Sequence, residues 1–407
     1  MIKKCIECSN DFEAKTKRAI FCTNTCAQRN ARNKSKAKSE FNDEELNDKV
    51  PIPTGVNTNL ETVTAVPTKE EQIKKSIHAE KKKVELTDKE KALRTVMDKM
   101  NKDFGKGTAR TLGEIGIEKV DAISTGSIAL DRAIGVGGIP RGKITEIYGM
   151  QSSGKTTLCL HIIREAQKMG LKCLFIDVEH AFDVDYADAI GVDTENLLFI
   201  QPDSAEQALE IMDRYISSGG IGVAILDSVA ALVPKSELEG EIGDAKVGLI
   251  ARLMGQACRK LTGSSNRTQT ACIFINQLRT DISIRYGNPN VPTGGNALKF
   301  FSSLRLDVSK TNLKDGDEMT GSRVKVKVVK NKVAPPFKVA EFDIYYGEGI
   351  DKVSELVDIA ITDGVIQQGG AWITYKEHKM QGKENFAEFL KEHEVILEEI
   401  QTIINKK

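Results

Sequence analysis

Several features that would narrow the class of this protein are missing from its sequence. Among 407 residues, lysine plus arginine and aspartate plus glutamate each number 58. Overall charge therefore indicates no polyanionic partner, and any nucleic-acid surface must be local. No apolar run is long enough to span a bilayer, and the first residues, Met1 to Cys5, lack the apolar stretch of a signal peptide. These absences favour a globular cytoplasmic protein of two or three domains, without a membrane partner.

Cysteine is sparse, and its eight copies form two groups. One group lies in apolar segments and is expected to pack as small hydrophobic filler. Its members are Cys159, Cys173, Cys258 and Cys272. The other group forms two close pairs within the first 26 residues, a spacing at which four thiolates can close a tetrahedral zinc site. These ligand candidates are Cys5, Cys8, Cys22 and Cys26. So short a segment has few apolar side chains, so zinc would supply the missing stability; the alternative is an incidental cysteine cluster.

Composition divides the chain into five parts. Residues 1–38 form the basic, cysteine-bearing zinc module, and residues 39–86 are polar, contain three prolines and are expected to be a linker. At Thr87 a capping-box pattern with Glu90 predicts a helix with one apolar stripe, which Gly105 can end. We assign residues 87–118 to a helical arm, 119–350 to the core and 351–407 to a C-terminal domain.

The core alternates apolar runs with helical patterns. The runs are mostly continuous rather than alternating, as in strands buried on both faces. The strand candidates are residues 144–148, 173–177, 223–227 and 271–277. The pattern predicts an α/β fold with a mainly parallel central sheet covered by helices. In the C-terminal part, a helical pattern lies around residues 386–404.

A phosphate-binding loop follows the first of these strands. Residues 149–156 read Gly-Met-Gln-Ser-Ser-Gly-Lys-Thr, which fits the G-x-x-x-x-G-K-[ST] motif in full. Its backbone N–H groups would surround phosphate oxygens, Lys155 would reach the outer phosphates and Thr156 would ligate Mg²⁺. Asp227, at the end of a buried strand, is the candidate second magnesium ligand. The alternatives are a chance glycine-rich turn and an aspartate that only caps the next helix.

The attacking water needs a carboxylate that orients or deprotonates it. Asp177, Glu179 and Asp183 all follow the strand at residues 173–177. Their spacing does not choose among the three.

Longer motifs carry a family resemblance. They stand at residues 123–127, 175–181, 240–244, 274–277, 293–300, 329–332 and 346–350. In order and with few gaps, they closely resemble bacterial RecA, from about Thr87 nearly to the end of the chain. The resemblance implies a RecA-type P-loop ATPase core, an N-terminal polymerisation arm and a small α+β C-terminal domain. It implies a DNA-dependent ATPase that forms a helical homo-oligomeric filament on single-stranded DNA with ATP and Mg²⁺, then exchanges strands with a homologous duplex. A LexA-like repressor is a further candidate partner.

The same resemblance assigns roles in the ATP site. Glu179 matches the catalytic glutamate and Gln277 the glutamine that senses the γ-phosphate. Lys330 and Lys332 match lysines that a neighbouring subunit extends into the site, adding positive charge like an arginine finger. The catalytic set is therefore Glu179, Lys155, Gln277, Lys330 and Lys332. The nucleotide-binding set is Gly149, Met150, Gln151, Ser152, Ser153, Gly154, Lys155, Thr156, Thr157, Asp183, Tyr186, Asp227, Tyr346 and Gly347.

Two segments, residues 239–248 and 278–292, resemble the family's DNA-binding loops. The family's base-separating apolar residue matches Ile282. Charge and backbone dipoles would track the DNA backbone, while base pairing reads the sequence. The expected DNA-binding residues are Arg252, Arg259, Arg279, Ile282, Gly294, Gly295 and Asn296. The alternative is that both segments are ordinary surface turns.

Two rival functions remain to be tested. A RadA-like branch-migration ATPase also joins a four-cysteine finger to a RecA-type core. Its Lys-Asn-Arg-Phe-Gly motif is replaced here by Lys-Asn-Lys-Val-Ala at residues 330–334, and few residues follow for its protease-like domain. The second rival is a non-catalytic protein that coats single-stranded DNA and binds ATP without turnover. The intact set of Lys155, Glu179, Asp227 and Gln277 argues against it.

Overall fold

The computed structural model describes residues 2–4, 11–13, 87–105, 107–111, 113, 120–241, 248–280 and 289–405. The chain divides into two compact units, Met1–Ala109 and Arg110–Lys407, and each is described by itself. The four zinc-ligand candidates lie outside the described residues, as do Ile282 and residues 242–247 of the first DNA loop.

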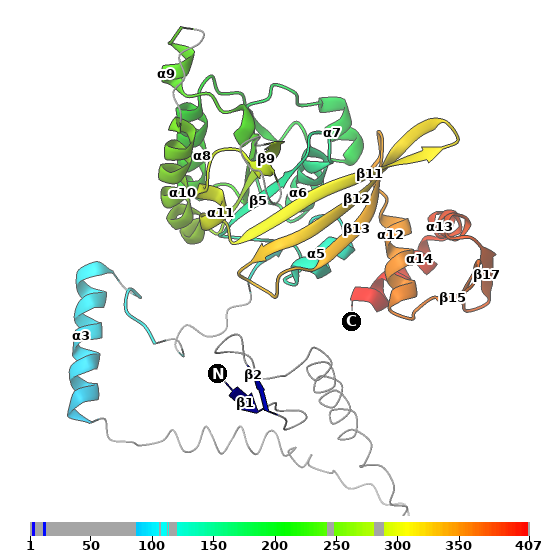
Figure 1. The fold of residues 1–407 in the computed structure, drawn as a ribbon, viewed down its shortest axis with the longest axis horizontal. Coiled ribbons are helices and arrows are strands. Elements are labelled where there is room, and N and C mark those ends of the chain that lie inside the picture. Colours follow the sequence, from blue (N-terminus) through cyan, green and yellow to red (C-terminus); the bar gives the residue numbers. More distant parts are fainter. Residues whose placement is uncertain are drawn as a thin grey trace, which may run out of the picture. The chain divides into compact units, whose positions relative to one another are not determined.

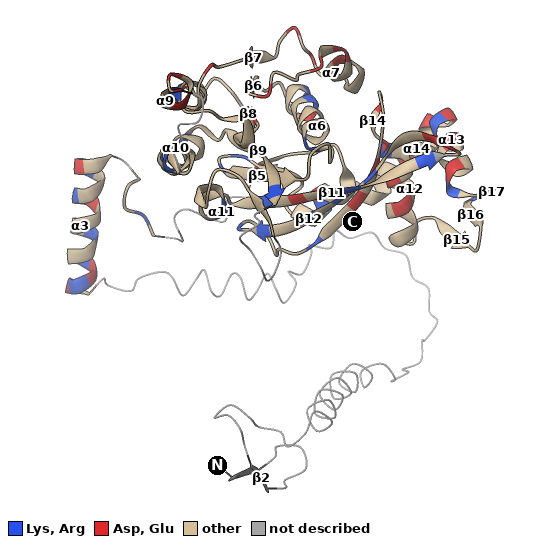
Figure 2. Cartoon of the chain, turned by 45° about the horizontal axis from the view of Figure 1, so that its top comes forward, with Lys and Arg blue, Asp and Glu red and all other residues tan. Residues whose placement is uncertain are grey.

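The described residues of the first unit form a short antiparallel strand pair and a long helix. Strands β1 (Ile2–Lys4) and β2 (Asp11–Glu13) pair with Ile2 opposite Glu13. Helix α3 (Asp88–Phe104) begins with the predicted capping box, because Glu90 N–H donates to the Thr87 hydroxyl and Thr87 N–H donates to the Glu90 carboxylate. Figure 2 marks acidic and basic residues along the ribbon of α3, and the apolar side chain of Leu93 is exposed.

A ten-stranded sheet forms the centre of the second unit, and Figure 1 shows helices on both of its faces. Its strand order is β14-β13-β12-β11-β5-β9-β8-β6-β7, and β10 pairs with β9. The bounds are β5 (Ile144–Gly149), β6 (Cys173–Asp177), β7 (Leu198–Ile200), β8 (Val223–Asp227), β9 (Ala271–Thr280), β10 (Asn290–Pro292), β11 (Leu304–Asp315), β12 (Glu318–Asn331), β13 (Val339–Tyr345) and β14 (Gly349–Ile350). The strands from β11 to β7 are parallel and those from β12 to β14 are antiparallel extensions. The predicted α/β class with a mainly parallel sheet is confirmed.

Two hydrophobic clusters cover the sheet, one on each face. The first contains side chains of α5 (Ile128–Ile134), α6 (Lys155–Lys168) and α7 (Val184–Ile190). The second contains side chains of α8 (Ala205–Ser218), α10 (Leu249–Thr268) and α11 (Ala297–Phe301). All four core cysteines are buried in these clusters, as expected for apolar filler. Short elements complete this part: β3 (Ala122–Ile123), β4 (Ile139–Pro140), η1 (Val229–Ala231) and α9 (Lys235–Leu238).

A third cluster forms the core of the C-terminal part, where helices pack on a three-stranded sheet. The elements are α12 (Lys352–Thr362), β15 (Gln367–Gly369), β16 (Trp372–Tyr375), β17 (His378–Gln381), α13 (Lys383–Glu392) and α14 (Glu394–Asn405). The single helical pattern predicted around residues 386–404 is two helices, because His393 has a non-helical backbone at φ −121° and ψ 71°. Across the residues that the structure describes, no helix is both long and apolar enough to cross a bilayer.

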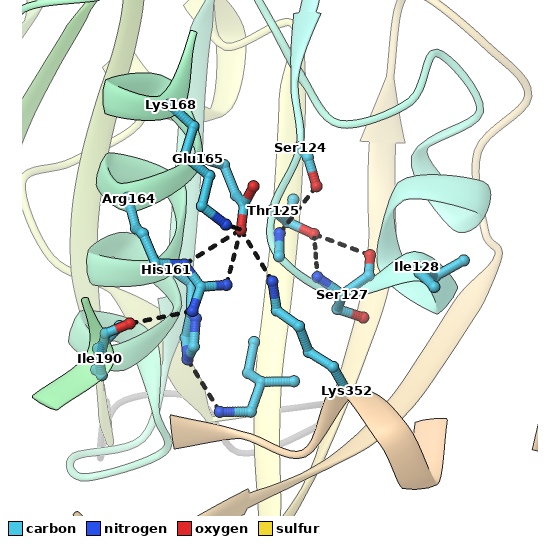
Figure 3. A network of polar contacts seen from close by, with 12 residues as sticks. Ser124, Thr125, Ser127, Ile128, His161, Arg164, Glu165, Lys168, Ile190 and Lys352 are labelled. Carbon is cyan, nitrogen blue, oxygen red and sulfur yellow. Dashed lines mark hydrogen bonds and ion pairs between the residues drawn. The ribbon is translucent and has the colours of Figure 1, made fainter. Parts of the chain in front are cut away.

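The P-loop helix α6 is tied to the start of the C-terminal part by polar contacts (Figure 3). Glu165 lies 2.7 Å from Arg164, 3.3 Å from Lys168 and 2.9 Å from Lys352 of α12. One turn earlier on α6, the buried His161 accepts a 2.9 Å hydrogen bond at Nε2 from the N–H of Ile350. Both contacts join the helix that follows the phosphate loop to the segment where the C-terminal part begins.

Candidate ATP and DNA site

The phosphate loop connects the end of β5 to the start of α6. A Cβ on Gly149 would lie 2.1 Å from the carbonyl oxygen of Val308, so only glycine fits beside β11. Gly154 has φ 90° and precedes α6 without a side-chain cap. The first N–H groups of α6 are therefore directed at the loop, where the helix dipole favours an anion.

The loop lysine lies against its own loop. Lys155 is 6% exposed, and its Nζ donates a 2.7 Å hydrogen bond to the carbonyl of Met150. Burial lowers the pKa of Lys155, while Asp227 and Glu179 act in the opposite direction. A desolvated ammonium at the concave side of the loop suits a polyanionic ligand.

Two hard oxygen ligands meet beside the loop. The Thr156 hydroxyl donates a 2.7 Å hydrogen bond to the Asp227 carboxylate. Burial raises the pKa of Asp227 to about 7, although the bond from Thr156 opposes the shift. A hydroxyl and a buried carboxylate in contact are a donor set that Mg²⁺ prefers, so these residues fit the ion that the sequence predicted.

The structure distinguishes the three acids that spacing left open. Glu179 accepts hydrogen bonds from the Ser228 hydroxyl and from Gln277 Nε2, the latter at 2.6 Å. Asp177 is buried and accepts from Gln201 Nε2 at 3.0 Å. Asp183 caps α7 by accepting from the N–H of Tyr186 at 2.9 Å. Of the three acids, only Glu179 accepts a hydrogen bond from Gln277, the candidate γ-phosphate sensor.

A cavity of about 480 Å³ opens over the loop. Its lining residues are Ser152, Ser153, Gly154, Lys155, Thr156, Thr157, Tyr186, Lys310, Ser322, Val324, Ile344, Tyr346 and Gly347. Tyr186 is held by a 3.3 Å hydrogen bond from its hydroxyl to Thr157. Sequence reasoning missed four of these residues, on β11, β12 and β13. β11 pairs with β5, β12 with β11 and β13 with β12, and only this order of strands brings the four residues to the loop, so no local motif could have shown them.

Nine predicted residues are not among those that line this cavity: Gly149, Met150, Gln151, Glu179, Asp183, Asp227, Gln277, Lys330 and Lys332. Asp183 points its carboxylate at the start of α7, as described above. Lys330 donates to the carbonyls of Lys299 and Phe300 at 2.8 and 2.9 Å, at the end of α11. Lys332 lies in a separate pocket beside Lys143. The trans role expected for both lysines concerns a neighbouring subunit and stays a prediction.

The second DNA segment begins and ends as a strand pair. Within predicted loop 278–292, β9 extends to Thr280 and pairs antiparallel with β10, with Thr280 opposite Asn290. The two ends of the predicted loop therefore form a strand-paired stem, and residues 281–288 lie outside the described part. Arg279 is exposed on the stem.

Other candidate DNA contacts lie next to this stem. Arg252 and Arg259 are exposed on α10, two turns apart and therefore on one face. Gly294 and Gly295 have φ 76° and 75°, and a Cβ on them would lie 2.6 Å from Val229 and 2.7 Å from Ala251. Asn296, exposed, begins α11. The glycine pair thus allows the chain to pass closely over η1 and α10.

Comparison with known proteins decides the family. A model of the RecA N-terminal domain matches residues 91–351, and one of the RecA C-terminal domain matches residues 354–407. The chain is 56% identical over 316 residues to Protein RecA of Heliobacterium modesticaldum, covering 77% of this chain and 91% of the relative. It is 56% identical over 322 residues to Protein RecA of Clostridium novyi, covering 79% and 92%.

The chain belongs to the RecA family. It is accordingly a DNA-dependent ATPase and a recombinase that forms filaments on single-stranded DNA and exchanges strands. The RecA C-terminal match occupies the region where the RadA-like rival would need a protease-like domain. That alternative is therefore wrong.

Proposed function

We propose that this RecA protein couples ATP hydrolysis to its grip on DNA through Glu179 and Gln277. The supporting observation is the 2.6 Å contact between Gln277 Nε2 and Glu179. Gln277 belongs to β9, the strand that continues into the stem of the second DNA segment. A change at the γ-phosphate thus has a direct route to the stem, through one side chain and one strand.

In the proposed reaction, the Glu179 carboxylate accepts a proton from a water whose oxygen attacks the γ-phosphorus. The bond from the γ-phosphorus to the β–γ bridging oxygen breaks, and ADP leaves with that oxygen. Lys155 and the loop N–H groups bind the triphosphate and stabilise the charge that develops on it. Mg²⁺, held by Thr156 and Asp227, would neutralise phosphate charge when bound. Tyr186, Tyr346 and Gly347 would contact the adenine side.

The remaining assignments follow the family. Asp183 would also contact the adenine side, and Lys330 and Lys332 of a neighbouring subunit would add positive charge in the filament. Exposed arginines would bind DNA phosphates. These arginines are Arg252, Arg259 and Arg279. Ile282 would insert between groups of bases, and the backbone N–H groups of Gly294, Gly295 and Asn296 would bind the DNA strand. A LexA-like repressor is a further proposed partner. We expect the protein in the cytoplasm, where its DNA substrate lies.

An active-site variant tests the catalytic proposal. Glu179→Gln keeps the side-chain shape but removes the base, so DNA-stimulated ATP hydrolysis should fall by about 10²- to 10⁴-fold. Filament formation on single-stranded DNA with ATP should persist. Wild-type protein that binds the strand but shows no DNA-stimulated hydrolysis would instead support the non-catalytic coating protein.

We also propose that Cys5, Cys8, Cys22 and Cys26 bind one Zn²⁺. The spacing of the two cysteine pairs supports this assignment. Zinc content of the purified full chain should be one ion per protomer, and changing all four cysteines to serine should abolish it. Cys258→Ser, a buried core cysteine, is the matched control and should retain the ion. Equal zinc content in both variants would contradict the site.

A further inference from the structure

A buried polar cluster lies beneath the DNA stem, on the face of the sheet that α10 and α11 cover. Glu146 is 1% exposed on β5, next to Ile144 and Phe274 of the second hydrophobic cluster. Its carboxylate accepts from Arg305 Nε of β11 at 2.5 Å and from Asn276 Nδ2 of β9 at 3.0 Å. A buried carboxylate is costly unless it is paired. Here it joins two strands that flank the phosphate-loop strand.

Asn276 has all its hydrogen-bonding capacity in use. Its Nδ2 also donates to the carbonyl of Thr293 at 3.0 Å. Its Oδ1 accepts from the Thr293 hydroxyl at 2.6 Å and from the N–H of Gln277 at 2.9 Å. With the bond to Glu146, two donors and two acceptors are satisfied, the full capacity of an amide. The side chain can therefore hold one orientation only.

These bonds span the DNA segment. Asn276 precedes the stem and Thr293 follows it, and the N–H of Thr293 donates to the carbonyl of Gln277 at 3.3 Å. Thr293 is also the residue before Gly294, the first of the two glycines expected to contact the strand. Both ends of the segment are thus joined to each other and, through Glu146, to the strand that ends in the phosphate loop.

We propose that Glu146 and Asn276 are positioning residues that fix the two ends of the DNA segment. With its ends fixed, movement of the Gln277 side chain is transmitted to the stem rather than lost in displacement of the whole segment. This inference rests on the proposed function, because it takes residues 278–296 as DNA-binding.

The cleanest test removes one bond at Thr293. Thr293→Val keeps the branched shape and deletes the hydroxyl bond to Asn276, while Thr293→Ser keeps the hydroxyl and is the matched control. Losing one neutral hydrogen bond should raise the Kd for single-stranded DNA, in the presence of a slowly hydrolysed ATP analogue, about fivefold. The affinity for the nucleotide without DNA should not change, and Thr293→Ser should behave as wild type.

Salt dependence separates positioning from direct contact. Thr293→Val should keep the wild-type slope of log Kd against log salt, because no phosphate contact is lost. Arg279→Ala should lower that slope by about 0.7, the loss of one phosphate contact on a single strand. Unchanged DNA affinity in Thr293→Val, or an equal loss of nucleotide affinity without DNA, would overturn the proposal. Wild-type protein whose DNA binding ignores the nucleotide would refute the proposed function instead.

Discussion

His161 makes a pH-dependent contribution to stability that one substitution can isolate. Its ring is 1% exposed, and Nε2 accepts the N–H of Ile350, a bond that only an unprotonated Nε2 can make. Burial lowers its pKa to about 3, and the nearby cations Arg164, Lys352 and Lys168 act in the same direction. Glu165 opposes them. The folded protein therefore favours the neutral form of the His161 ring.

The sign and size of the effect follow from linkage. Between pH 3 and the unfolded value near 6.5, the unfolded chain binds the proton and the folded chain does not, so stability falls as pH falls. From pH 7.5 to 5.5, the loss attributable to His161 is about 1.4 kcal/mol. Above pH 6.5 the contribution is fully present.

Urea unfolding of wild type and His161→Gln, at pH 7.5 and at pH 5.5, measures the contribution of His161 to the free energy of unfolding. Glutamine can accept from Ile350 but does not titrate, and other groups titrate equally in both proteins. The wild type should therefore lose about 1.4 kcal/mol more than the variant between pH 7.5 and 5.5. Equal losses in the two proteins would refute the assignment of a neutral buried His161.

Two further predictions concern the sheet around the phosphate loop. Gly149→Ala should weaken binding of a fluorescent ATP analogue at least about tenfold, because its Cβ has no room beside Val308; Gly255→Ala, where a Cβ meets open space on α10, should leave that affinity unchanged. Arg305→Met should lower the free energy of unfolding in urea by about 3 kcal/mol, because Glu146 is left buried and unpaired. Adding Glu146→Gln to that variant should recover part of the loss.

Sequence patterns predicted those features that depend only on residues close together in the sequence. The phosphate loop was readable because its glycines, lysine and threonine are contiguous, and the buried strands because apolar side chains on both faces leave a continuous run. Thr87 and Glu90 gave the start of α3 for the same reason. The proposed base could not be selected from spacing alone, because the contacts of Glu179 with Ser228 and Gln277 form only when three strands lie side by side.

The sequence did not show which strands far apart along the chain pair with one another. The alternating apolar pattern at residues 324–329 and 342–346 suggests an antiparallel extension of the sheet. It does not show that β11 pairs with β5 and β12 with β11, the order that places Lys310 and Val324 at the nucleotide cavity. The predicted DNA loop at 278–292 was too long, since its ends are polar enough to suggest a loop but pair as β9 and β10. His393 interrupts a pattern whose apolar spacing continues across the break, so one helix was expected where two exist.

The alternation of β9 explains how one strand can serve both ligands. Side chains two residues apart point to the same face, so Gln277 and Arg279 share one face about 7 Å apart, and Asn276 points to the other. On one face the strand therefore carries the contact to Glu179 and, two residues later, a candidate phosphate contact. On the other face, Asn276 is held by Glu146 and Thr293. A strand anchored on one face, and carrying both proposed ligand contacts on the other, would transmit a change at the γ-phosphate with little loss, since its backbone is also paired to β5 and β8.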